Sequence, residues 1–189
     1  GMHTWVFRRR RFLNWWWIGL AFAFFYFGRY NLTVAKGALG DLMTKAEFGD
    51  IKLVGSWVYG ISFLISGPFA DKYGGTKAML RGTWGTMFAN FAMGVMLFVR
   101  YRFQLDFSVY IPFIVLFGLN MHFQSYGAIS VVKVKAPWFH VDERGQFGTI
   151  FGWMISAGTY FAFGWGYSIE TATRAVVSKD PGYFGNAMS

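Results

Sequence analysis

The sequence contains no cysteine, and charged residues make up only 14% of its 189 positions. Without cysteine, a disulfide scaffold is excluded. Charged residues are about half as frequent as in soluble domains, whereas hydrophobic residues reach 54% and aromatic residues 22%. This hydrophobicity excludes a disordered chain, and so much aromatic surface argues against a cytosolic globule. The composition is that of a polytopic membrane protein.

Acidic residues are also scarce, with nine Asp and Glu against 18 Lys and Arg and a formal net charge of +9. A basic chain can indicate nucleic-acid binding, but here the basic residues flank long apolar runs. Four consecutive arginines at positions 8–11 precede three tryptophans at 15–17, a combination typical of an anchor at the membrane edge. We therefore expect a lipid bilayer as a partner, and no nucleic acid.

Five stretches reach the length of about 20 apolar residues that a membrane-crossing helix needs. They lie at about 13–35, 51–70, 79–99, 108–132 and 147–168. The sequence thus predicts an all-α, polytopic transmembrane helix bundle over residues 13–168. Residues 1–12 are expected to form a basic amino-terminal flank, and residues 169–189 an external loop. Because the chain begins with glycine and ends in a polar tail, we expect a fragment of a longer protein.

The distribution of Lys and Arg predicts the orientation. Ten of these residues lie in the amino-terminal flank and the second and fourth connectors, whereas seven lie on the opposite side. Since basic residues are enriched in cytoplasmic segments, the amino terminus is predicted to be cytoplasmic. The expected location is the cell (inner) membrane.

Small residues recur at a spacing of four, which lets helices approach closely in lipid. The last stretch has one stripe of Gly148, Gly152 and Ser156 and another of Gly158, Ala162 and Gly166; the third has Gly82, Thr86, Asn90 and Gly94. These stripes predict helix–helix contacts in a compact bundle.

Arg29 lies near the end of the first apolar stretch. A guanidinium at mid-bilayer is costly unless it meets a partner or a wet cavity. One interpretation places it inside the membrane, facing an anionic substrate, because the second to fifth stretches contain no Asp or Glu. The other ends the helix near Gly28 and lets Arg29 reach the membrane surface.

Further polar side chains within the stretches are candidates for a substrate site: Tyr30, Asn31, Tyr59, His122, Gln124 and Tyr126. Gly118, His122 and Tyr126 share one helical face, and Asn120 and Gln124 share another. A polar helix of this kind favours a cavity lining, although each of these groups can also serve as an interhelical hydrogen bond.

Catalytic and cofactor motifs are missing from the sequence. The three histidines lie on separate segments, and neither a metal-binding set, a phosphate-binding glycine loop nor a nucleophile elbow occurs. We therefore predict no enzyme and no cofactor.

The connector after the second stretch contains Gly67, Asp71, Lys72, Gly74 and Lys77. It resembles the signature between helices 2 and 3 of the major facilitator superfamily. Arg29 with Asn31 is similar to the Arg-x-Asn of the organophosphate:phosphate antiporters. The stretch from Trp138 to Gly145 resembles the Trp-Trp-x-x-x-Glu-Arg-Gly of that family.

This resemblance implies a major facilitator fold, of which the chain would be five of the six helices of the amino-terminal half. It implies a secondary transporter that exchanges a small organic anion, an organic phosphate, for inorganic phosphate by alternating access. The family's phosphoryl-binding arginine falls on Arg29, and a cavity glutamine falls on Gln124. The remaining half of the protein would be a partner. The residues that the resemblance assigns to the gate and signature loop are Gly67, Asp71, Lys72, Gly74, Lys77, Glu143, Arg144 and Gly145.

The sequence departs from the family pattern at four positions. Phe63 and Tyr30 stand where related antiporters have lysines, a histidine position falls near Ile155, and Thr76 occupies a basic position. These changes imply a less positive site. Three alternatives stay open: a proton-coupled symporter of an organic acid, a transporter-like sensor of a sugar phosphate, and a structural half-transporter that assembles with a second chain.

Overall fold

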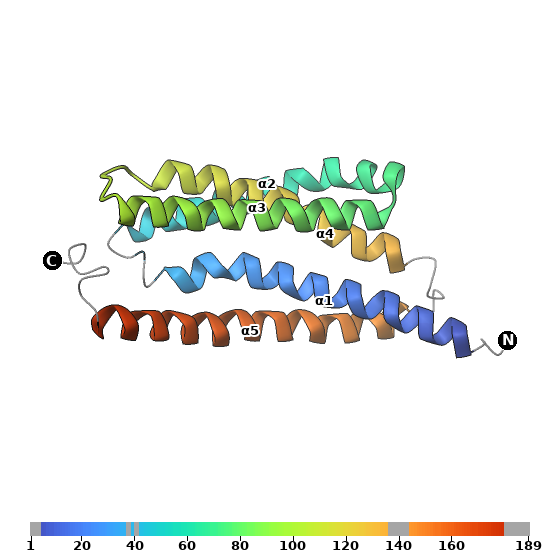
Figure 1. The fold of residues 1–189 in the computed structure, drawn as a ribbon. Helices are drawn as coiled ribbons and strands as arrows, with labels where there is room; N and C mark the ends of the chain where they lie inside the picture. The colour runs from blue at the N-terminus through green and yellow to red at the C-terminus, as the bar shows by residue number, and fades with distance from the viewer. Residues whose placement is uncertain (1–4, 37–38, 40–41, 136–143, 180–189) are drawn as a thin grey trace.

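The computed structural model describes residues 5–36, 39, 42–135 and 144–179, which form five helices and no strand (Figure 1). The helices are α1 (Trp5–Ala35), α2 (Lys45–Tyr73), α3 (Gly75–Arg102), α4 (Tyr110–Lys135) and α5 (Arg144–Lys179). The predicted all-α helix bundle is thereby confirmed.

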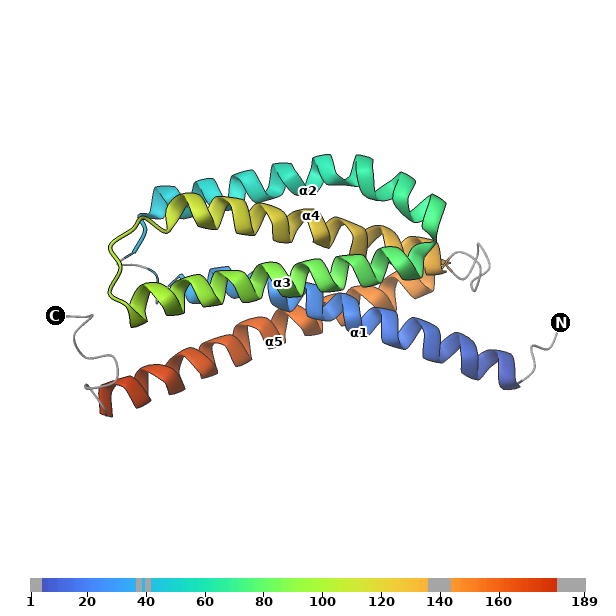
Figure 2. The ribbon, with the colours of Figure 1, turned by 45° about the horizontal axis from the view of Figure 1, so that its top comes forward.

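Helix α4 organises one part of the bundle, because it packs against both α2 and α3. The other part is the pair of α1 and α5, which pack against each other. Helix α1 joins the two parts through contacts with α4 and α3. Figure 2 shows α2, α4 and α3 on one side and the α1–α5 pair on the other.

Only Gly74 separates α2 from α3, where the sequence predicted a connector of several residues. Its φ of 87° lies in the left-handed region that glycine adopts without strain, and its N–H donates to the Ala70 carbonyl at 3.0 Å. The signature residues therefore lie mostly on helices. Gly67, Asp71 and Lys72 belong to the end of α2, and Lys77 belongs to the start of α3.

Helix α5 continues to Lys179, so residues 169–179 of the predicted external loop are helical. This segment contains good helix formers and neither glycine nor proline, and Pro181 comes only afterwards. The extension brings Glu170 and Tyr167 to the end of the bundle where α1 ends and α2 begins.

Two helices, α2 and the 75–100 part of α3, are long and apolar enough to cross a membrane. Large apolar side chains also project from the bundle surface, with Leu64 at 76% and Trp153 at 77% exposure. Soluble monomers rarely expose contiguous apolar area on this scale. Membrane crossing by all five helices stays a prediction of the sequence.

Small residues bring α1 close to α5 and α3 close to α4. A Cβ added at Gly158 would lie 2.6 Å from the Ala23 carbonyl oxygen on α1, and Ala162 is fully buried. A Cβ at Gly82 would lie 2.9 Å from the Phe123 carbonyl oxygen on α4. In the described chain, Gly148 and Gly152 have no neighbour within 4 Å of such a Cβ. One of the two stripes on α5 is therefore a helix contact here, and the other faces open space.

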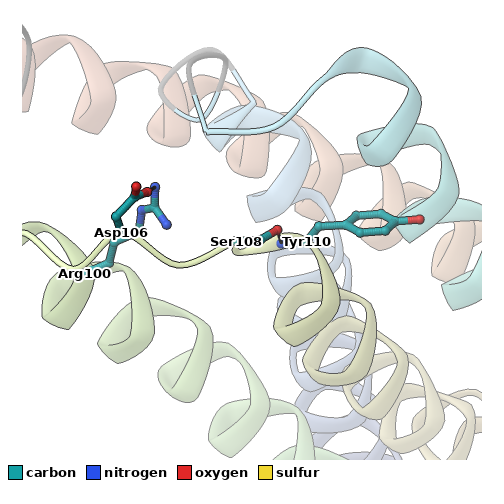
Figure 3. A network of polar contacts seen from close by, with 4 residues as sticks. All are labelled: Arg100, Asp106, Ser108 and Tyr110. Carbon is teal, nitrogen blue, oxygen red and sulfur yellow. Dashed lines mark hydrogen bonds and ion pairs between the residues drawn. The ribbon is translucent and has the colours of Figure 1, made fainter.

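The connection from α3 to α4 is held by polar contacts (Figure 3). Arg100 lies 3.8 Å from Asp106, and the Tyr110 N–H donates to the Ser108 hydroxyl oxygen at 3.4 Å. The Tyr110 hydroxyl donates to Asp50 on α2 at 3.2 Å. The first turn of α4 is thereby tied to α2.

The close contact at Gly158 generates a stability prediction. Gly158→Ala places a methyl group against the backbone of α1, which cannot move aside as a flexible side chain would, so we expect a loss of about 1–3 kcal/mol. In the control Gly164→Ala, the new Cβ meets nothing within 4 Å, and the better helix propensity of alanine should leave stability equal or slightly higher. Thermal unfolding in detergent measures both, and equal melting temperatures would contradict the prediction.

Candidate functional site

Arg29 lies inside α1, six residues before its end, and its side chain is partly buried. The Arg29 Nε donates a hydrogen bond of 2.7 Å to the Gln124 Oε1 on α4. This contact joins residues 95 positions apart and supports the interior interpretation of Arg29. The helix does not end near Gly28, as the alternative requires.

Two aromatic rings flank the guanidinium. The Arg29 Cζ lies 4.6 Å from the ring centre of Tyr59 on α2 and 5.0 Å from that of Tyr26, one turn earlier on α1. Aromatic faces attract a cation at such distances. The site therefore holds Arg29 between α1, α2 and α4.

A chain of side-chain amides holds Gln124 in place. The Gln124 Nε2 donates to the Asn120 Oδ1 at 3.2 Å, and the same oxygen accepts from the Asn90 Nδ2 on α3 at 3.2 Å. Asn120 and Gln124 are 0% and 1% exposed. Because both are buried and bonded, the acceptor that meets Arg29 has a fixed position.

Buried polar atoms without partners lie beside this chain of amides. Within the described residues, Asn120 Nδ2 and Thr86 Oγ1 are buried and make no hydrogen bond. An unsatisfied buried polar group costs about 1–3 kcal/mol. Apolar side chains at these positions would avoid that cost, so stability alone does not account for the polar residues here.

His122 faces α2, on the other side of α4 from the contact with Arg29. Its Nδ1 lies 2.8 Å from the Ser62 hydroxyl, and the ring is partly buried. The two faces of α4 predicted from residue spacing are therefore separate in the structure, and both are used for contacts between helices.

Three other predicted site residues have surroundings of their own in the described structure. Tyr30 packs with Tyr26 and with Phe163 on α5, at ring distances of 6.3 and 5.3 Å. Asn31 is partly buried on α1. Tyr126 is 1% exposed and packs in a cluster with Ala70 and Ala78. Burial leaves Tyr126 little surface for a ligand.

The signature residues lie at the end of the bundle where α2 ends and α3 begins, and one of them, Asp71, forms an ion pair. Asp71 on α2 pairs with Lys133 on α4, and both side chains are partly exposed. Lys72 lies over the ring of Tyr73. Arg144 and Gly145 open α5, whereas Glu143 lies outside the described residues.

Two interaction partners of the predicted site residues were not predicted from residue types and spacing: Tyr26, which flanks Arg29, and Lys133, which pairs with Asp71. Tyr26 precedes Arg29 by three residues, and this helical spacing was the available signal. Lys133 was counted only for orientation, and no local signal pairs it with Asp71, 62 positions earlier.

The arrangement is suited to binding an anion. A guanidinium has five N–H donors, and in the described chain the Nε–H of Arg29 makes its single hydrogen bond. Four N–H groups remain in a planar fork that matches phosphate or carboxylate oxygens. Within the described residues, no carboxylate lies within ion-pair distance of Arg29.

Comparisons with known proteins find relatives named as transport and membrane sensor proteins. The probable hexose phosphate transport protein of Chlamydia trachomatis is 31% identical over 134 residues, which are 69% of this chain and 27% of that protein. Membrane sensor protein UhpC of Escherichia coli is 27% identical over 140 residues, or 72% of this chain and 29% of that protein. No family model and no solved structure matches the chain.

The matched relatives are named as transport proteins and membrane sensors rather than enzymes. The chain spans less than a third of the length of these relatives. It is a relative of the hexose phosphate transport and membrane sensor proteins, as its resemblance to the organophosphate:phosphate antiporter family of the major facilitator superfamily predicts.

Proposed function

We propose that the chain is part of a secondary transporter that exchanges an organic phosphate for inorganic phosphate by alternating access. It lies in the cell (inner) membrane with its amino terminus in the cytoplasm, and all five helices cross the bilayer. Arg29 is the principal charge contact for the phosphoryl group. The observation that carries the proposal is the partly buried guanidinium, fixed through Nε by Gln124 with its remaining donors unused.

The physical argument is one of charge compensation. A guanidinium surrounded by apolar helices is unfavourable unless an anion meets it. Because neither an acidic residue nor a second hydrogen bond meets Arg29 in the described chain, a bound phosphoryl group would supply the missing partner. Inorganic phosphate and the phosphoryl end of the substrate would compete for this fork, and this competition would couple their movements in opposite directions.

Neighbouring residues bear on the substrate class. Phe63, at a position of lysine in related antiporters, packs edge-on against Tyr59 at 4.9 Å. Ile155 joins an apolar cluster with Phe22 and Phe151. The names of the relatives favour a sugar phosphate. The apolar neighbours favour a site in which Arg29 alone supplies positive charge from these helices.

The ion pair of Asp71 and Lys133 supports a role in gating. It joins the ends of α2 and α4 next to the break at Gly74, on the side predicted to be cytoplasmic. An ion pair that is present in one state and broken in the other biases the equilibrium between the two states. We infer that this pair stabilises the state described here.

A transporter-like sensor is the second candidate, because two of the matched relatives are named membrane sensor proteins. A sensor would bind the anion at the same arginine without net exchange. A proton-coupled symporter would require a titrating group, for which His122 beside Ser62 is the candidate in these helices.

The first prediction concerns Arg29 in the complete gene product, reconstituted into phosphate-loaded liposomes. We expect Arg29→Gln and Arg29→Lys to lower exchange about 10- to 100-fold, because a charge-assisted bond is worth about 1.5–3 kcal/mol and a lysine cannot replace the fork. Arg102→Gln, at an exposed position on α3, is the control for the loss of one charge.

Each outcome of this experiment separates the candidates. Exchange that depends on Arg29 supports the antiporter. Phosphate binding without exchange in a folded protein would favour the sensor, and uptake driven by a proton gradient alone would favour the symporter. Unchanged exchange in both Arg29 variants would refute the proposed role of this residue.

The second prediction tests the support of Arg29 by Gln124. Gln124→Leu removes the acceptor for the Arg29 Nε, so we expect the concentration of phosphate at half-maximal exchange to rise about tenfold. Ser130→Ala is a matched control, since Ser130 is also fully buried on α4 but donates to a carbonyl of its own helix. Equal behaviour of the two variants would refute the positioning role.

The third prediction tests the ion pair. Asp71→Asn and Lys133→Gln should each slow exchange a few-fold, within the range of about 0.2–1 kcal/mol for an exposed pair, with a smaller change in phosphate binding. The double variant should be no slower than either single variant, because both remove one interaction. Additive effects, or an equal loss of binding and rate, would argue against gating by this pair.

A further inference from the structure

A cavity of about 470 Å³ opens where α1 ends and α2 begins, with α5 forming its other wall. It lies at the end of the bundle opposite the ion pair of Asp71 and Lys133. None of the residues predicted to bind substrate lines it. The lining residues that carry the argument are Thr33, Lys36, Thr44, Lys45, Phe48 and Glu170.

Two lysines lie at the ring of Phe48, which lines the cavity: Lys36 is itself a lining residue, and Lys52 reaches the ring from α2. The Lys36 Nζ lies 4.9 Å and the Lys52 Nζ lies 5.6 Å from the centre of the ring of Phe48, which is 5% exposed. Like charges gathered at one ring repel each other unless an anion lies between them. In the part of the chain that the structure describes, no carboxylate is within ion-pair distance of either ammonium group.

Hydrogen-bond donors complete the basic side of the cavity. The Thr33 hydroxyl oxygen accepts from the Lys52 Nζ at 3.3 Å, so its own hydrogen remains free to donate. Lys45 is the first residue of α2, where the positive end of the helix dipole disfavours a cation. A lysine at this position is therefore electrostatically unfavourable, and an anion bound nearby would offset the repulsion.

The cavity is aligned with Arg29. Thr33 lies four residues after Arg29, so the two share one face of α1. Lys36 lies seven residues after Arg29, in the turn that directly follows the helix. Four residues of helix rise about 6 Å. The donors at the cavity therefore lead along α1 to the guanidinium of the candidate site.

We propose that this cavity captures the phosphoryl group of an anion before it reaches Arg29. Lys36 and Lys52 neutralise its charge, the Thr33 hydroxyl donates to one of its oxygens, and Lys45 raises the local positive potential. The capture role rests on the proposed function, because it assumes that the anion moves on from the cavity to Arg29. Binding of an anion in the cavity does not rest on that function.

The test measures binding of inorganic phosphate by calorimetry to the complete gene product in nanodiscs of phosphatidylcholine. An Arg29→Gln background disables the central site and leaves the cavity. In this background we expect a remaining phosphate site that Lys36→Gln or Lys52→Gln weakens roughly fivefold. The control Arg102→Gln, at an exposed position on α3, should leave it unchanged.

Absence of phosphate binding in the Arg29→Gln background would overturn the proposal, as would lysine variants that behave like Arg102→Gln. If exchange does not depend on Arg29 while the cavity still binds phosphate, the proposed function is refuted and the cavity site is not. Repeating the titration in nanodiscs with phosphatidylglycerol identifies the source of the phosphoryl group. Competition would support a lipid headgroup in this site, and unchanged phosphate binding would support a dissolved anion.

Discussion

The hydrogen bond from Arg29 to Gln124 connects the two parts of this bundle through a charged group. Apolar side chains provide no hydrogen bonds to replace those that a guanidinium loses with its hydration water. The position of Arg29 therefore depends on the acceptor that α4 presents. That acceptor depends in turn on Asn120 and Asn90, which are buried between α4 and α3. Helices α1, α3 and α4 are therefore joined by one chain of polar contacts.

Close backbone contacts form the framework around this chain of polar groups. Glycines at the α1–α5 and α3–α4 contacts let the helices approach so closely that a methyl group would meet backbone atoms. Such contacts gain dispersion energy where lipid offers no hydrophobic drive.

The two ends of the bundle differ in their electrostatics. At one end, Asp71 and Lys133 neutralise each other next to a single-residue break. At the other, lysines gather at the ring of Phe48 without a compensating carboxylate among the described residues. An anion would be attracted to the basic end and would meet Arg29 six residues before the end of α1. This asymmetry is the electrostatic arrangement expected for a path that an anion enters from one side.

The sequence by itself determined the class of fold and the identity of the charged centre. Apolar runs of membrane length predicted helices. An arginine among them, with no acidic residue in the second to fifth stretches, indicated an anionic partner as one of two interpretations. Residue spacing also predicted that His122 and Gln124 lie on different faces of α4. Each of these conclusions depends on neighbours within one helix, whose geometry follows from its 3.6-residue period.

Only the tertiary structure decided which helix each face meets. It buried Tyr126 among Ala70 and Ala78, turned Tyr30 toward α5, and gave Asp71 its partner on α4. It also extended α5, so that Glu170 joined α1 and α2 around a basic cavity. These contacts join residues 48 or more positions apart, and their geometry comes from the packing of whole helices. Helical period and amino-acid composition describe one helix at a time, so they do not specify how whole helices pack against each other.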